Sequence, residues 1–186
     1  MTRTFGPCRL GGMSEHARRL ELVRVPGDRR LYALDGVGTL RLHGMLMRSA
    51  TAAAREGTWS FTRRSAWRRS LRATDALGVE VGTFMPREIR RGGTLHWRGR
   101  EYLLRPHSVL RERYVLADAD RELVVIEATG WWGWGARRPV RLTLEQPAAV
   151  EPGLLLFASF IVRTLADGAA SDAGGSAAVV TTSSGV

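Results

Sequence analysis

Short runs in which apolar and polar residues alternate fill most of the chain. In residues 58–62, TWSFT, the two aromatic side chains fall on one face and the polar side chains on the other. A period of two is typical of β-strands that bury one face. The runs interpreted in this way are residues 21–25, 31–44 (a hairpin), 58–62, 66–74, 78–84, 93–97, 101–105, 113–117, 122–128 and 140–146. Short strands separated by a few turn residues predict an all-β antiparallel meander, folded as a sandwich or a barrel.

Two of the predicted hairpins are similar to each other. Residues 70–84 and 113–128 both consist of a strand, a turn that begins with Asp, and a second strand, with Asp75 and Asp118 at the turns. Asp suits such turns because its carboxylate accepts hydrogen bonds from nearby backbone N–H groups. Either two related antiparallel layers or coincidence among short hairpins explains the pattern.

Residues 153–166, GLLLFASFIVRTLA, form the most apolar segment of the chain. The uninterrupted apolar run ends at Arg163, well short of the roughly 20 residues that a membrane-spanning helix needs. Pro152 suits the first turn of a helix, where its missing N–H has no intrahelical partner to lose. Large apolar side chains point in every direction around this helix, so we predict that it is buried on all sides by a closed apolar wall.

Composition divides the chain into three parts. We interpret residues 1–19 as a flexible leader, residues 20–166 as one domain, and residues 167–186, rich in Ala, Gly and Ser, as a disordered tail. The formal net charge is +10, and every basic residue apart from the histidines is Arg. A basic surface attracts phospholipid headgroups, nucleic acid and acidic proteins. The absence of Lys is also typical of a bacterial genome of high GC content, so the charge by itself selects none of these partners.

The candidate chemical groups favour a binding protein over an enzyme. Cys8 is the only cysteine, so no intrachain disulfide forms and we expect a cytoplasmic protein. The four histidines lack the spacing of metal ligands. The sequence DADRE, residues 118–122, resembles a calcium loop, but Leu123 and Thr129 stand where an EF-hand needs Gly and Glu. We therefore predict no catalytic residues, no metal and no cofactor.

The first candidate binding segment is residues 130–135, GWWGWG. Trp prefers the headgroup level of a membrane, and adjacent arginines would pair with phosphate. The candidate residues are Trp131, Trp132, Trp134, Arg137 and Arg138. The alternative is that the three tryptophans pack over one end of a barrel.

The second candidate is the Arg-rich stretch of residues 55–72. Arg63, Arg64, Arg68 and Arg69 alternate with aromatic residues, a pattern suited to pairing with phosphate and stacking on exposed bases. The alternative is a solvated strand face whose arginine stems cover apolar neighbours.

The paired turns ATDALGVEVG and LADADRELVV, the GTWSF strand and the apolar helix after EPG resemble the tubby C-terminal-like superfamily, which includes LURP-one-related proteins and phospholipid scramblases. The resemblance covers residues 20–166 and implies a closed antiparallel β-barrel of about twelve strands around a central C-terminal helix. Eukaryotic tubby domains bind phosphoinositides through basic side chains, but no motif of this sequence matches theirs closely enough to nominate equivalent residues. The cysteine-rich and proline-rich segments of scramblases are missing here, so scrambling activity is not implied.

Together these features predict a non-enzymatic binding module that associates with anionic phospholipid, cytoplasmic and peripheral at the membrane, without a transmembrane span. The alternatives are nucleic-acid binding through residues 55–72 and a protein–protein scaffold.

Overall fold

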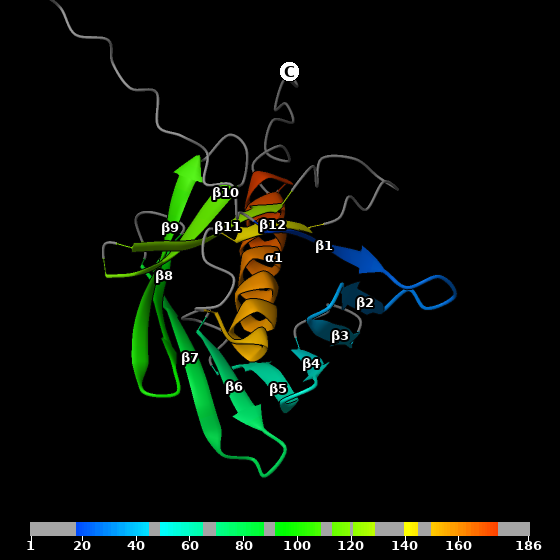
Figure 1. Ribbon diagram of the computed structural model, residues 1–186. Helices are drawn as coiled ribbons and strands as arrows, with labels where there is room; N and C mark the ends of the chain where they lie inside the picture. Colours follow the sequence, from blue (N-terminus) through cyan, green and yellow to red (C-terminus); the bar gives the residue numbers. More distant parts are fainter. Residues whose placement is uncertain are drawn as a thin grey trace, which may run out of the picture.

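The structure, a computed structural model, describes residues 18–44, 49–64, 70–87, 92–108, 113–119, 121–128, 140–144 and 150–174. Within these residues, twelve antiparallel strands form a closed barrel around one helix (Figure 1). The elements are β1 (Arg18–Arg24), β2 (Leu31–Leu34), β3 (Gly38–His43), β4 (Ser49–Ala54), β5 (Gly57–Arg63), β6 (Leu71–Asp75), β7 (Glu80–Pro86), β8 (Gly93–Trp97), β9 (Arg100–Ser108), β10 (Arg113–Asp118), β11 (Arg121–Ala128), β12 (Val140–Leu144) and α1 (Pro152–Gly174). The predicted barrel with a central C-terminal helix is confirmed.

Each strand pairs with the strands before and after it in the sequence, and β1 pairs with β12 to close the barrel. In an antiparallel meander, successive connections alternate between the two ends of the sheet. We call the end that carries the β2–β3, β4–β5, β6–β7, β8–β9 and β10–β11 connections the turn end. The opposite end, which carries the β1–β2, β3–β4, β5–β6, β7–β8, β9–β10 and β11–β12 connections, is the loop end. Helix α1 begins at the turn end and runs toward the loop end (Figure 1).

The core consists of the inner faces of the strands and the whole circumference of α1. Residues 153–163 of the helix are all buried, as the absence of a polar face predicts. Phe61 on β5 lies 5.0 Å from Phe157 and 5.7 Å from Phe160, measured between ring centroids. Ser159 is buried without cost because its hydroxyl donates to the Leu155 carbonyl at 2.7 Å.

The first turn of α1 is fixed by two tryptophans. A Cβ added to Gly153 would lie 2.6 Å from Cζ2 of Trp97 and 2.8 Å from Cζ2 of Trp59, so only glycine fits between these indoles. The indole Nε1 of Trp97 donates to Oε2 of Glu151 at 3.1 Å, and the same oxygen lies 3.2 Å from Nη1 of Arg98. These contacts join the start of the helix to the β8–β9 turn.

Two features differ from the prediction. Strand β4, SATAAA, was not among the predicted strands, since Ala has low strand propensity; its inward side chains, Ala50 and Ala52, are small and let α1 approach. The helix continues to Gly174, so residues 167–174, predicted as disordered, are helical. The rest of the predicted tail and residues 1–17 lie outside the described part of the chain.

The similarity between the two Asp-containing hairpins extends to an irregularity in their pairing. The register between β6 and β7 shifts between Ala73 and Thr74, and the register between β10 and β11 shifts between Leu116 and Ala117. In both hairpins the shift is separated from the turn Asp by one residue. A β-bulge at the same position of both hairpins favours a structural relationship over coincidence.

Candidate functional site

The two ends of the barrel differ in charge. Among the described connecting residues, the loop end has four arginines, Arg29, Arg30, Arg64 and Arg87, and one acid, Asp28. The corresponding residues at the turn end are two arginines, Arg55 and Arg98, and three acids, Asp35, Glu56 and Glu151. The loop end is therefore a basic pole of the molecule.

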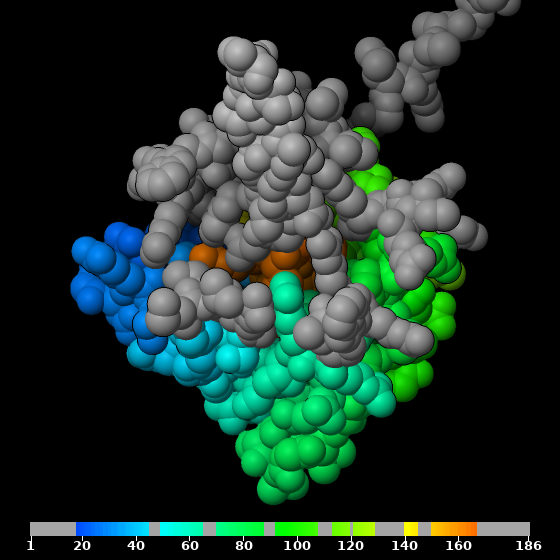
Figure 2. Space-filling model, turned by 180° about the vertical axis from the view of Figure 1, so that it is seen from behind, coloured from blue at the N-terminus to red at the C-terminus, as the bar shows by residue number. Residues whose placement is uncertain are grey.

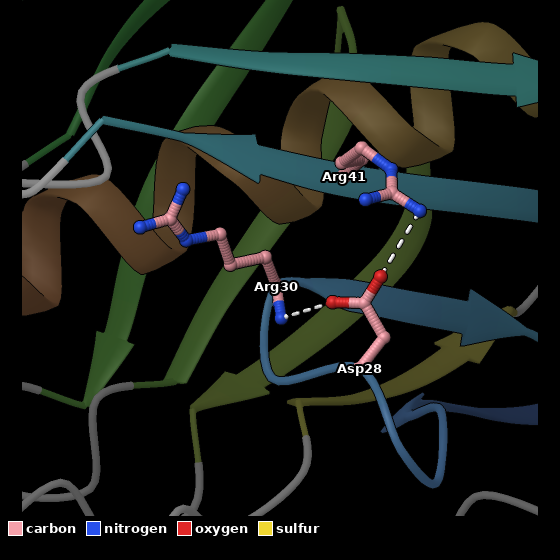
Figure 3. Close-up of polar contacts among 3 residues, drawn as sticks. All are labelled: Asp28, Arg30 and Arg41. Carbon is pink, nitrogen blue, oxygen red and sulfur yellow. Dashed lines mark hydrogen bonds and ion pairs between the residues drawn. The ribbon is translucent and has the colours of Figure 1, made fainter.

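The β1–β2 connection is held in shape by its single acid. Oδ1 of Asp28 accepts a hydrogen bond from the backbone N–H of Arg30 at 2.9 Å, and Oδ2 lies 3.0 Å from Nη2 of Arg41 (Figure 3). The backbone hydrogen bond from Arg30, together with the charge of Arg41, lowers the pKa of the Asp28 carboxyl below its usual value. The guanidinium of Arg30 points away from this carboxylate (Figure 3). Asp28 thus orders the connection by accepting a hydrogen bond from the backbone of Arg30, while the Arg30 guanidinium points in another direction.

Two of the predicted arginines belong to this end. Arg63 is the last residue of β5 and pairs with Leu71, and the N–H of Arg64 donates to the Ser70 carbonyl at 2.9 Å. Nη1 of Arg64 lies 4.0 Å from Oε1 of Glu80, whose second oxygen is 3.8 Å from Nε of Arg72. Both distances are long and all three side chains are solvent-exposed, so this ion pair holds Arg64 only weakly.

The other predicted residues lie outside the described residues: Trp131, Trp132, Trp134, Arg137, Arg138, Arg68 and Arg69. Their chain neighbours are described. Ala128 and Val140, which pair with each other, flank the segment with the three tryptophans, while Arg64 and Ser70 flank the segment with Arg68 and Arg69. Both segments are therefore attached to the barrel at the loop end.

The two described aromatic residues of the Arg-rich stretch, expected on the surface, are instead in the core. Trp59 is 3% exposed and Phe61 is fully buried, because both face α1. Neither ring is accessible for stacking on a base. The alternation in this stretch therefore reflects a strand whose aromatic side chains are in the core and whose arginines are at the surface.

Many arginines on the outer wall of the barrel pair with acids on adjacent strands. Arg113 lies 3.2 Å from Glu127, and Arg141 lies 3.5 Å from Glu21, each pair spanning two neighbouring strands. Such exposed pairs contribute little to stability, but they balance the charge of the wall. The charge difference between the two ends therefore comes from the described connecting residues and not from the wall.

The turn end differs from the loop end in carrying exposed apolar side chains. The tip of the β6–β7 hairpin carries Leu77, 88% exposed, and Val79, 57% exposed. Oδ1 of Asp75 accepts hydrogen bonds from the N–H groups of both residues at 2.9 Å. Seen from behind, this hairpin projects below the rest of the barrel (Figure 2). The turn end thus presents a rigid apolar tip, opposite to the basic pole.

Arg24, Arg29, Arg30 and Arg87 were not among the predicted site residues, although they belong to the same end as Arg63 and Arg64. Arg24 ends β1, Arg29 and Arg30 lie in the β1–β2 connection, and Arg87 lies in the β7–β8 connection, so all four are distant in sequence from Arg63 and Arg64. Because successive connections of a meander alternate between the two ends of the sheet, a correct assignment of the strands would have placed these arginines at one end.

Comparisons of the chain with models of protein families, with curated proteins and with solved structures found no match. Within the described residues, no helix has both the length and the apolarity to cross a bilayer. The same part of the chain contains no group of three or more His, Cys, Asp or Glu residues placed to hold a metal ion. Function is therefore inferred from the charge and geometry of the loop end.

Proposed function

We propose that the protein is a non-enzymatic module that binds the surface of anionic phospholipid membranes through the loop end of its barrel, from the cytoplasmic side. The observation that carries this proposal is the charge difference between the two ends, with Arg29, Arg30, Arg64 and Arg87 at one end. Basic residues near an anionic surface each contribute about 1 kcal/mol of attraction. Several such residues on one face give reversible binding in a defined orientation.

The described aromatic residues of the Arg-rich stretch give no support to binding of single-stranded nucleic acid. Binding of single strands relies on aromatic side chains on which bases stack, and Trp59 and Phe61 are buried against α1. Headgroup binding needs only accessible cations. The segment with Trp131, Trp132 and Trp134 is attached at the same end and supplies the residue type that prefers the headgroup level.

We also propose that the protein belongs to the tubby C-terminal-like superfamily. The closed twelve-strand barrel around a C-terminal helix supports this assignment. A shared fold leaves the ligand to be decided by the residues of the site, so the lipid proposal depends on the basic pole and not on the family.

The test is flotation with vesicles of phosphatidylcholine containing phosphatidylglycerol. The double variant Arg29→Glu/Arg87→Glu removes two cations from the loop end, and we expect its affinity to fall by roughly thirtyfold or more, about 1 kcal/mol for each cation lost. The matched control, Arg55→Glu/Arg100→Glu, changes the net charge equally at the turn end and should bind within a few-fold of wild type.

Equal losses in the two double variants would show that net charge and not the loop end controls binding. If the wild-type protein does not float with anionic vesicles at low salt, the proposal is wrong. Preferential binding to duplex or single-stranded DNA under the same conditions would favour the nucleic-acid alternative.

A further inference from the structure

We propose that the rim of the barrel between β1, β2 and α1 binds one phosphate group, using the Tyr32 hydroxyl and the guanidinium groups of Arg24 and Arg30. This inference deepens the proposed function, on which it rests, by naming the chemical group that is recognised and the residues that contact it. The phosphate can belong to a lipid headgroup or to a small molecule.

Strand pairing determines the direction of these side chains. Tyr32 is on the inner face of β2, 5% exposed, and pairs directly with Arg24 on β1. Directly paired residues project to the same face of a sheet. Arg30 precedes Tyr32 by two residues, and its carbonyl accepts from the N–H of Leu42 at 2.8 Å, so the pairing of β2 with β3 extends to this position. Side chains two residues apart in a strand share a face, which places Arg24 and Arg30 on the inner side of the rim, next to Tyr32.

Helix α1 contributes a further cation at this point. The guanidinium carbon of Arg163 lies 4.6 Å from the centroid of the Tyr32 ring, and Arg163 is 6% exposed. A guanidinium over the face of an aromatic ring is attracted by the ring electrons, more strongly where water is excluded. Arg163 therefore holds the Tyr32 ring in place and adds positive charge beside it.

The Tyr32 hydroxyl itself is buried, and its oxygen has no hydrogen-bond partner among the residues that the structure describes. Buried polar groups without a partner are uncommon and call for an explanation, of which a bound ligand is one. A phosphate oxygen would accept the hydroxyl proton. Arg24 and Arg30 are exposed and long, so rotation of their side chains can admit an anion to this hydroxyl.

The described acids of the loop end pair with cations other than Arg24 and Arg30. The described carboxylates at this end are Asp28 and Glu127, which pair with Arg41 and Arg113 on the outer wall. The inner side of the rim thus combines hydroxyl and guanidinium donors without a described carboxylate. Arginine matches phosphate because its planar fork donates two parallel hydrogen bonds to two oxygens.

The test uses Tyr32→Phe, which keeps the ring and its contact with Arg163 but removes the hydroxyl, and Arg30→Gln, an exposed substitution that should not disturb folding. Arg55→Gln is the matched control, because it removes the same charge from an exposed position at the turn end. Binding of inorganic phosphate is measured by isothermal titration calorimetry, and binding to vesicles containing phosphatidic acid is measured by flotation. We expect Tyr32→Phe and Arg30→Gln each to weaken binding by roughly tenfold or more, since hydrogen bonds to charged groups are the stronger ones, and Arg55→Gln to change it much less.

Losses with both probes would show that phosphate itself is recognised, and losses with vesicles alone would assign the site to a lipid headgroup; either result supports the inference. Wild-type binding by Tyr32→Phe to both probes would overturn it, as would equal weakening by Arg55→Gln and Arg30→Gln. If all three variants still float while Arg29→Glu/Arg87→Glu does not, the phosphate site is wrong and the proposed surface binding stands.

Discussion

Gly153 allows the first turn of α1 to pack closely against two tryptophans of the barrel. Its missing side chain leaves the space that the indoles of Trp59 and Trp97 occupy, and the Trp97 Nε1 is tied to Glu151, two residues before Gly153. The two indoles contact each other at 6.1 Å between ring centroids. A residue that would ordinarily weaken a helix is therefore required here by packing.

Gly153→Ala tests this interpretation by the sign of its effect. At an unobstructed helical position the exchange of Gly for Ala stabilises by up to about 1 kcal/mol. Here the new Cβ would lie 2.6 Å from Trp97, so we expect a loss of about 1–3 kcal/mol, the usual cost of overpacking. Urea denaturation followed by tryptophan fluorescence measures the change in the free energy of unfolding. An increase in stability would contradict close packing of residue 153 against the tryptophans.

At the scale of elements, β4 and α1 depend on each other. The helix contacts β3, β4, β5 and β11, and β4 lines it with alanines, of which Ala52 is fully buried. Phe61 on the adjacent strand fills the space that the small residues leave, through its contacts with Phe157 and Phe160. Small side chains on one strand and large ones on the next are needed to enclose a helix that is itself bulky on all sides.

Substitutions at two neighbouring alanines of β4 distinguish the effect of core packing on stability from the effect of strand propensity. Ala52→Leu places a larger side chain against the core, and we expect a loss of about 1–3 kcal/mol. Ala53→Leu, on the opposite face of the same strand, should change stability by less than about 0.5 kcal/mol. Chemical denaturation of both variants gives the comparison, and equal effects would show that the inner face of β4 is not tightly packed against the helix.

The strands also show which parts of the fold can be predicted from sequence patterns and which cannot. Alternation identified strands such as β5 and β8, because β-branched and aromatic residues favour strands by themselves. The alanines of β4 carry no such preference, and this segment is a strand because β3 and β5 pair with it on both sides. Arg63 and Arg64 were recognisable as a cluster, whereas Tyr32 and Arg24 become neighbours only when β1 and β2 pair.

At the scale of the whole molecule, one pairing differs from the others. Each strand from β2 to β11 pairs only with its neighbours in sequence, but β1 pairs with β12, for example Glu21 with Arg141. Closing a long loop costs more entropy than closing a hairpin. We therefore expect the β1–β12 seam to form late in folding, after the local hairpins.

Leu142→Ala and Leu95→Ala test the order of these events. Both side chains are fully buried, Leu142 in β12 at the seam and Leu95 in β8 within a hairpin. Each substitution should destabilise the protein by about 2–5 kcal/mol. In stopped-flow kinetics, Leu142→Ala should mainly accelerate unfolding and Leu95→Ala should slow refolding more. A refolding rate that falls equally in both variants would place the seam in the transition state.

The position of α1 also has a consequence for biosynthesis. Ribosomes add about 5–20 residues per second, and domains fold as their segments emerge. The residues that fill this barrel, such as Phe157 and Phe160, are translated after all twelve strands. Until they emerge, the nascent chain has a complete set of amphipathic strands and nothing to cover their apolar faces. This interval is when chaperones would be most needed and aggregation most damaging, and a ribosome stalled shortly before codon 157 would release a product that no later step could complete.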